Sequence, residues 1–156
     1  MSTETIRVVL ARHLAAEAAH DASGAAAMYA EDGFYENHAL GLRFEGRGGV
    51  ELQYAASYET IRDMKATYLF EQIDGDQVMQ CGRITGTAAE AILGVPTRQG
   101  DLDFAFLAMI VFRDDEMVGE HIVYDLDDFC AQAGVDVKMV SAAAVEFNRA
   151  LNAVGP

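Results

Sequence analysis

The sequence is poor in basic residues and has no long apolar run. Its 156 residues include 11 lysines and arginines against 25 aspartates and glutamates, for a formal net charge of -14. A chain this acidic repels phosphate backbones and anionic lipid surfaces, so neither nucleic acid nor a membrane is an expected partner. The expected partner is a small molecule or another protein.

Cysteine is also scarce. Cys81 falls in an expected strand and Cys130 in an expected helix. Two cysteines without close spacing form neither a disulfide framework nor a zinc site, and they indicate reduced core residues of a cytoplasmic protein. The first residues, MSTETIRVV, show no basic segment followed by an apolar run, so we expect neither a signal peptide nor a transmembrane span.

Apolar residues, in contrast, make up 51% of the chain. That is enough for a core that folds without disulfides or metals at this length. No repeat or low-complexity linker divides the sequence. We therefore expect one domain over residues 1–156, with a core at about residues 5–135 and a C-terminal helix at about residues 137–153.

Apolar periodicity and turn residues predict the order of the elements. The expected helices are Thr3 to His20, a short one ending at Tyr29, Gly49 to Arg62, Leu126 to Ala133 and Val137 to Leu151. The expected strands are Phe34 to His38, Lys65 to Ile73, Gln77 to Ala88, Asp101 to Phe112 and Met117 to Asp125. Loops are expected at 39–46 and 94–100. This order predicts an α+β fold in which a curved antiparallel sheet wraps around helices and leaves a cavity at its open end.

The last expected strand is unusual. His121 and Asp125 are four residues apart, so in a regular strand both side chains point to one face. We expect that face to line the cavity, where an imidazole and a carboxylate would supply the chemistry of a pocket. Two alternatives stay open: the pair is structural, or Asp125 is only the N-cap of the following helix.

Several segments resemble known families. The stretches Arg12 to Gly24 and Met28 to Asn37 look like the opening of ketosteroid isomerases. Others look like SnoaL-like polyketide cyclases: Gly46 to Val50, Ile73 to Val78, Cys81 to Thr87, Gly94 to Thr97 and Asp125 to Gly134. The order of elements resembles the nuclear transport factor 2-like cone, also called a cystatin-like roll. The resemblance implies a single SnoaL-like domain, and its relatives include isomerases, cyclases, dehydratases, epoxide hydrolases and binding domains.

The functional positions of these families match the chain only in part. The isomerase base falls on Asn37 and the oxyanion-stabilising tyrosine on His13, which argues against steroid isomerisation. The cyclase acid falls on Val123. The limonene-epoxide-hydrolase pattern of arginine and aspartate becomes Arg83 and Thr85, and its second aspartate also falls on Val123. Half of that hydrolytic machinery is therefore missing.

Polar residues remain at positions that face the cavity in relatives. They are His13, Asn37, Arg83, His121 and Asp125. Asp125 or His121 would carry a proton, and Arg83 or His13 would polarise a carbonyl or hydroxyl group. Structural roles are open for each: His13 as a helix-surface histidine, Asn37 as a turn residue and Arg83 as the partner of a carboxylate.

Aromatic residues could form the wall of the pocket. Tyr54, Phe104 and Phe106 are candidates for substrate contacts, together with Asn37, although aromatic side chains in helices and strands also serve as ordinary core. The four histidines are scattered without ligand spacing, so we expect no metal site. The chemistry considered requires no cofactor.

A deep apolar pocket with these groups suits proton transfer beside a carbonyl. The leading hypothesis is a cofactor-independent lyase or isomerase that isomerises, dehydrates or cyclises a small hydrophobic cyclic metabolite such as a polyketide, steroid, terpenoid or aromatic compound. A non-catalytic binding or dimerisation domain is the alternative, and an epoxide hydrolase with Asp125 as the base is the third reading.

Assembly is expected through the outer face of the sheet. Strand alternation assigns five apolar residues to that face, which are too apolar for open water: Leu69, Ile84, Val118, Ile122 and Tyr124. We therefore expect a homodimer through the sheet.

Overall fold

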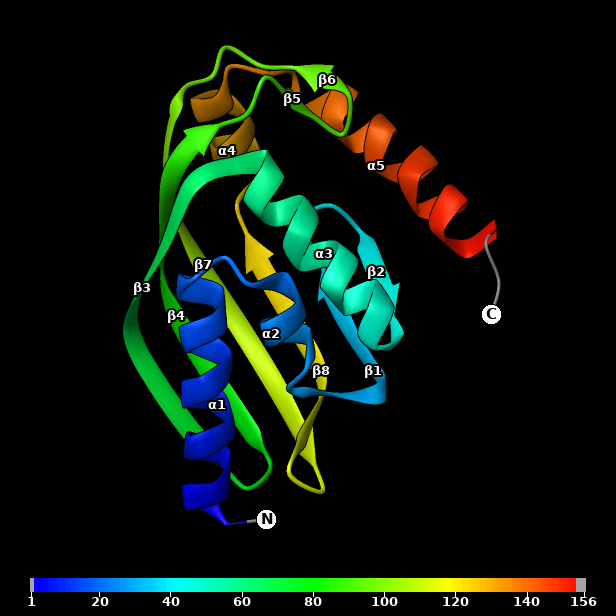
Figure 1. Ribbon diagram of the computed structural model, residues 1–156. Helices are drawn as coiled ribbons and strands as arrows, with labels where there is room; N and C mark the ends of the chain where they lie inside the picture. Colours follow the sequence, from blue (N-terminus) through cyan, green and yellow to red (C-terminus); the bar gives the residue numbers. More distant parts are fainter. Residues whose placement is uncertain (1, 154–156) are drawn as a thin grey trace.

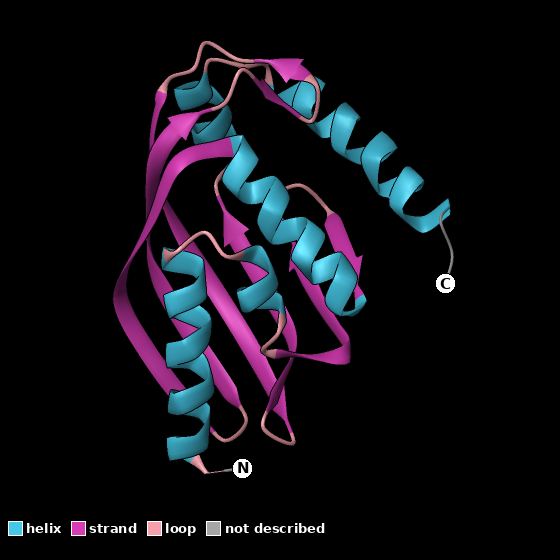
Figure 2. Ribbon diagram, in the orientation of Figure 1, coloured by secondary structure: helices cyan, strands magenta, loops and turns pink. Residues whose placement is uncertain are grey.

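The computed structural model describes residues 2–153 and shows the expected α+β arrangement of helices against one face of a curved, unclosed sheet (Figure 1). Helices α1, α2 and α3 lie over that face, which is drawn behind them in Figure 2. Their bounds are Thr3–Ala18, Ala22–Ala26 and Gly46–Thr60. Helices α4 (Leu126–Ala133) and α5 (Val137–Ala153) follow the last strand.

The sheet has six strands in the order β2-β1-β8-β7-β4-β3. Their bounds are Tyr29–Asn37 for β1, Leu42–Glu45 for β2, Ile61–Asp74 for β3, Gln77–Ala88 for β4, Asp101–Arg113 for β7 and Glu116–Tyr124 for β8. All neighbouring strands are antiparallel except β1 and β8, which are parallel. The parallel pair brings the end of β1 beside the end of β8, although the two strands are far apart in sequence.

Three short strands differ from the sequence prediction. The segments 39–46 and 94–100 were expected to be loops, but β2 occupies part of the first, and β5 (Ala91–Ile92) and β6 (Val95–Pro96) form a small hairpin that reaches into the second. Strand β1 begins at Tyr29, where a helix was expected to end, because Tyr29 pairs with Met117 of β8. Strands β2 and β6 each pair with the strand just before them, and only the start of β1 at Tyr29 depends on a partner distant in sequence.

A β-bulge in β8 contradicts the expected orientation of that strand. Two adjacent residues of β7 pair with Met117 and Gly119 of β8, so β8 holds one extra residue, Val118, between them. One extra residue sends every later side chain to the opposite face. Glu120 therefore faces the helices, and His121 faces away from them.

The outer face was consequently predicted wrongly. Ile122 and Tyr124 of β8 line the cavity, and so does Ile84 of β4. Val118 is half-buried at the bulge itself. Leu69 is on the exposed surface as expected, with 69% of its side chain accessible.

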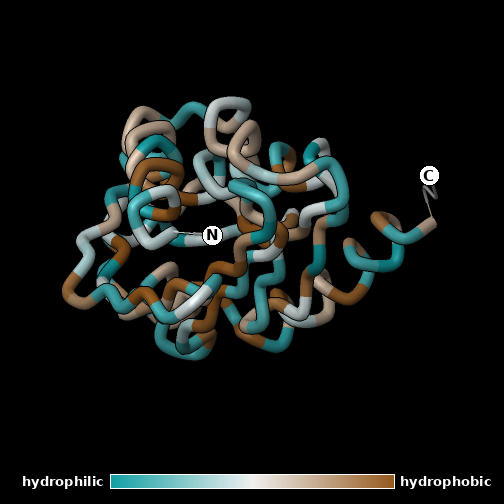
Figure 3. The backbone as a smooth tube through the Cα atoms, turned by 90° about the horizontal axis from the view of Figure 1, so that it is seen from below, coloured by the Kyte–Doolittle hydropathy of each residue, from teal (hydrophilic) through white to brown (hydrophobic). Residues whose placement is uncertain are grey.

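Helix α5 joins the main core through Val140 and forms a small second cluster through its later residues. Ala144, with Phe147 and Leu151 at its side, contacts Leu42 and Phe44 of β2 in a small second cluster. Viewed from below, helix α5 projects to one side of the two layers formed by the other helices and the sheet (Figure 3). Within residues 2–153, no helix combines the length and the apolar character that crossing a bilayer requires.

Candidate functional site

A cavity of about 380 Å³ lies between the helices and the inner face of the sheet. Its volume falls within the range of small-molecule sites. Apolar side chains make most of the wall, among them Leu42, Ile84, Ile92, Phe104, Phe106 and Ile110. Polar side chains interrupt this surface, and two groups of them bear on the chemistry considered.

The first group surrounds Glu120, which is only 6% exposed. Its Oε2 accepts hydrogen bonds from the hydroxyl groups of Tyr29 and of Tyr54, the latter over 2.8 Å. His13, on α1, has its Nε2 3.1 Å from the Tyr54 hydroxyl and 3.8 Å from Oε2 of Glu120. Among residues 2–153 no hydrogen bond engages Glu120 Oε1, which leaves that oxygen available to a ligand.

The hydrogen bonds define where the protons are. His13 Nδ1 lies 3.2 Å from the carbonyl oxygen of Ala25, and a carbonyl only accepts, so Nδ1 carries a proton. Tyr54 has one hydroxyl proton and donates it to Glu120. When Glu120 is ionised, Nε2 of His13 donates to the Tyr54 oxygen, and His13 is then an imidazolium. The chain of donors runs from His13 through Tyr54 to the carboxylate.

Electrostatics agrees with this assignment. Burial opposes the charge of His13, but the hydrogen bond and negative charge of Glu17, assisted by Glu120, raise the pKa of His13 above its ordinary value. Nε2 of His13 lies 3.5 Å from Oε1 of Glu17. Burial, followed by the charge of Glu17, raises the pKa of Glu120, while His13 and the two tyrosine hydroxyls oppose that rise. The pKa of Glu120 is therefore raised above that of an ordinary glutamate, the direction that strengthens a carboxylate as a base.

The second polar group is Asn37 with Tyr124. Asn37 Oδ1 accepts the backbone N–H of Leu40 over 3.1 Å, and this orients the amide so that Nδ2 donates to the Tyr124 hydroxyl oxygen over 3.2 Å. Tyr124 accepts here, and among residues 2–153 no acceptor engages its own proton, which can therefore go to a ligand oxygen. Burial raises the pKa of Tyr124 to about 12, and the hydroxyl therefore stays a donor throughout the physiological range.

The structure brings together five of the residues selected from the sequence. His13, Asn37, Tyr54, Phe104 and Phe106 all line the cavity. His13 is buried inside the domain rather than on a helix surface. Whether these residues bind or transform a ligand stays a prediction.

Three other candidates lie elsewhere, so the expected orientation of His121 and Asp125 is wrong. None of them lines the cavity. His121 is on the outer face because of the bulge. Arg83 is exposed on the outer face and pairs with Asp103, with Nε 2.6 Å from Oδ1. Asp125 is exposed and caps α4 by accepting the backbone N–H of Asp128 over 3.0 Å.

Glu120 is the residue that sequence reasoning missed. Regular alternation places it on the outer face, opposite His121. One signal was present, because a glycine inside a strand often marks a bulge, and Gly119 directly precedes Glu120. An ideal Cβ at position 119 would lie 2.5 Å from Cζ of Phe34, so only glycine fits beside that ring.

The sequence matches the family model for the SnoaL-like domain over residues 10–120. The chain belongs to the SnoaL-like domain family. No curated protein matches this SnoaL-like chain. Solved structures supply its fold relatives, and all those described below share less than 25% of their residues with it.

Three such structures illustrate the likeness. A hypothetical protein with a ketosteroid isomerase-like fold from Catenulispora acidiphila, solved with trimethylamine, is 22% identical, with a TM-score of 0.71 over 83% of this chain and 95% of that one. A proposed SnoaL-like polyketide cyclase from Jannaschia sp. CCS1 is 15% identical, with a TM-score of 0.76 over 85% and 95%. An NTF2-like protein from Burkholderia xenovorans is 16% identical, with a TM-score of 0.69 over 86% and 99%.

Proposed function

We propose that this SnoaL-like domain is a cofactor-independent lyase or isomerase that moves a proton beside a carbonyl group of a small hydrophobic cyclic metabolite. The substrate would be a polyketide, steroid, terpenoid or aromatic compound. The observation that carries the proposal is a buried carboxylate, Glu120, which lines an apolar cavity with one oxygen uncommitted. The family, which includes cyclases and isomerases, supports this class of chemistry.

Glu120 acts as the general base. Its Oε1 removes a proton from the carbon next to the substrate carbonyl, while Oε2 stays bonded to Tyr29 and Tyr54. The raised pKa of Glu120 strengthens it as a base compared with an ordinary carboxylate. The nearby His13 opposes the rise in the pKa of Glu120 and so favours its ionised form.

Tyr124 stabilises the enolate that this step produces. Its free hydroxyl proton is donated to the developing oxyanion, a role that apolar surroundings strengthen. Tyr124 and Glu120 lie four residues apart on one face of β8, which separates their Cα atoms by about 13 Å. The α-carbon and the enolate oxygen are only two bonds apart, so the two side chains, which line the same cavity, would reach toward each other across that face. Return of the proton to another carbon gives isomerisation, loss of a β-hydroxyl group as water gives dehydration, and attack of the enolate on a second carbonyl gives ring closure.

Proton transfer can be tested without the natural substrate. The protein is incubated in D₂O with α-tetralone and a three-ring homologue, and deuterium entry next to the carbonyl is followed by NMR. The expected result is exchange well above the buffer rate, saturating with ketone concentration. Tight binding of the ketones with exchange no faster than in buffer would overturn the proposal and identify a binding domain instead.

We also propose a homodimer through the outer face of the sheet. One row across four strands, in register, consists of Phe70, Cys81, Leu107 and Val123. Phe70 is 52% exposed, Leu107 41% and Val123 46%, and exposed Leu69 and Met79 lie nearby. A contiguous apolar surface of this kind is typical of an interface.

Sedimentation velocity tests the dimer. Wild-type protein is expected to sediment as a dimer at micromolar concentration, and Leu107→Glu as a monomer. Val145→Glu is the matched control, since Val145 is a similarly exposed apolar residue on α5. A monomeric wild type, or a dimer that survives Leu107→Glu, would contradict this assembly.

We also propose a cytoplasmic location. Cys81 and Cys130 are both free thiols. Free thiols persist in reducing compartments, which supports a cytoplasmic protein.

A further inference from the structure

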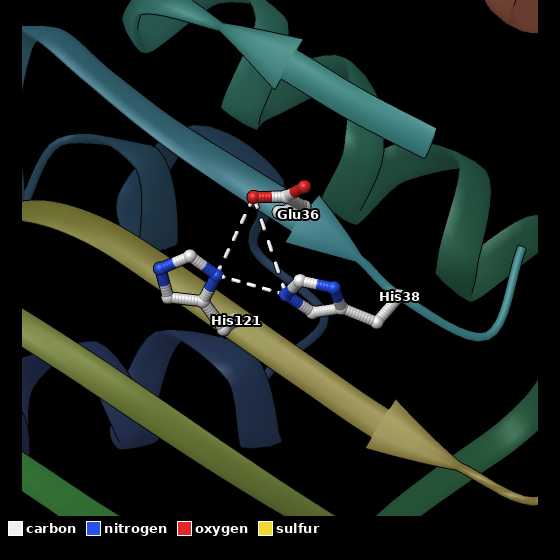
Figure 4. A group of neighbouring side chains, drawn as sticks. All are labelled: Glu36, His38 and His121. Carbon is white, nitrogen blue, oxygen red and sulfur yellow. Dashed lines mark hydrogen bonds and ion pairs between the residues drawn. The ribbon is translucent and has the colours of Figure 1, made fainter. Parts of the chain in front are cut away.

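Three metal-ligating side chains converge on the outer face of the sheet, away from the cavity. Glu36 of β1 and His121 of β8 are direct partners in the parallel strand pair, and His38 follows immediately after β1. His38 Nε2 lies 2.9 Å from His121 Nδ1. Glu36 Oε2 lies 3.4 Å from His121 Nδ1 and 4.0 Å from His38 Nε2 (Figure 4).

These separations match a tetrahedral metal site. Zinc binds histidine nitrogen and carboxylate oxygen at about 2.0–2.2 Å, which places ligand atoms of a tetrahedron about 3.3–3.5 Å apart. The three separations above fall on both sides of that value, so shifts of a few tenths of an ångström suffice. Two imidazoles and one carboxylate form a set that zinc accepts, with a fourth position left for water.

We propose that Glu36, His38 and His121 bind one Zn²⁺ ion on the outer face of the sheet. The ion would join the end of β1 to β8, two segments 83 residues apart at their histidines. Because it binds the folded chain and not the unfolded one, it would stabilise the fold.

The ligands are held in place before any ion arrives. The His121 ring packs edge-on against Phe34, with ring centroids 5.2 Å apart, and stacks on His38 at 5.2 Å. Arg43 donates from Nη1 to Glu36 Oε2 over 3.0 Å and lies over the Phe34 ring. Arg43 orients the carboxylate of Glu36. A bound ion would share that carboxylate with the guanidinium of Arg43.

The site is independent of the proposed proton transfer. Glu36, His38 and His121 do not line the cavity, and His121 faces away from Glu120. The spacing of histidines along the sequence does not reveal this group. Its residues are far apart in sequence and meet only because β1 pairs with β8. Loss of zinc binding would therefore leave proton exchange in the cavity unchanged.

The test uses the full chain, stripped of metal with EDTA and titrated with ZnCl₂ in a calorimeter. We expect one Zn²⁺ per chain, a higher Tm with zinc, and no comparable effect of Mg²⁺. Titration with Co²⁺ should produce the intense visible absorption of tetrahedral coordination. His121→Gln and His38→Gln should each weaken zinc binding by at least about tenfold, the size of effect seen when metal-site residues are lost.

His20→Gln is the matched control, because His20 is an exposed histidine on a distant part of the fold, stacked on Tyr58. It should bind zinc as the wild type does. Equal binding by the wild type and both site variants would show only unspecific attraction to an acidic surface and would overturn the proposal. So would the absence of zinc binding at 100-fold excess. His38 has 44% of its side chain exposed, so its variant folds and keeps the test decisive.

Discussion

Replacement of Glu120 by glutamine is the most direct test of the candidate site. Glutamine keeps the shape of the side chain, and its amide oxygen can accept the hydroxyl groups of Tyr29 and Tyr54 as Oε2 does now. It cannot take up a proton. Loss of a general base lowers the rate by ~10²- to 10⁴-fold, which corresponds to about 2.7–5.5 kcal/mol of activation free energy.

The same substitution should make the free energy of unfolding less dependent on pH. The folded protein raises the pKa of Glu120, so folding favours its protonated form. The free energy of unfolding contributed by Glu120 therefore falls as pH rises from the ordinary glutamate pKa of 4.5 through the raised value. Glu120→Gln removes this loss, and its stability should depend less on pH in that window.

Loss of the attraction to His13 works against the stability of Glu120→Gln. Its Nε2 lies 3.8 Å from Oε2 of Glu120, an attraction of about 4 kcal/mol at an effective dielectric constant of about 20. The variant loses this attraction, and the pKa of His13 should fall because only Glu17 and the carbonyl of Ala25 then support its charge. A raised histidine pKa contributes stability below 6.5 that is lost as pH rises through the folded value. In the Glu120→Gln variant, the stability contributed by protonated His13 should be lost at a lower pH than in the wild type.

The assays are deuterium exchange into α-tetralone, urea unfolding between pH 4 and 8, and NMR titration of the histidines. His121→Gln serves as the control because it alters the neighbouring residue of the same strand on the other face. Wild-type exchange by folded Glu120→Gln would refute the assignment of the base. An unchanged His13 titration would refute the donor chain from His13 through Tyr54 to the carboxylate.

Three further changes have defined outcomes. Tyr54→Phe removes a hydrogen bond that lowers the pKa of Glu120, so the rising limb of the exchange rate against pH should move to higher pH; an unmoved limb would contradict the bond. Asp125→Ala should cost about 1 kcal/mol of unfolding free energy through loss of the helix cap while exchange continues at the wild-type rate, and a large loss of exchange would restore Asp125 as a catalytic residue. Gly119→Ala should destabilise by about 1–3 kcal/mol in urea unfolding, because its Cβ would meet the Phe34 ring at 2.5 Å; full stability would show that the ring moves aside freely.

Local patterns predicted the regular elements well. The bounds of β4 at Gln77–Ala88 and of α4 at Leu126–Ala133 agree with the sequence prediction, because the turn at Asp74 to Asp76 and the cap at Asp125 are local signals. Strand β2 was missed, since four residues gain strand conformation only by pairing with β1. Its partner β1 ends at Asn37, just before β2 begins at Leu42, but so short a run shows too little alternation to be recognised as a strand.

The site was predicted only in part for a related reason. His13 and Tyr54 are on helices, where spacing along the sequence gives the face that a side chain occupies. Glu120 is on a strand, where one extra residue reverses the face of everything that follows. Its buried position depends on how β8 pairs with β7, which neither composition nor alternation reveals.

The bulge at Val118 thus decides two properties of the molecule together. Without it, regular pairing would turn the carboxylate of Glu120 to the surface and the imidazole of His121 into the cavity. With it, the carboxylate meets two phenols and an imidazolium in an apolar cavity, where burial raises its pKa. The imidazole meets Glu36 and His38 across the parallel strand pair. Adjacent residues of one strand therefore belong to two separate sites, and the chemistry proposed for each follows from the same inserted residue.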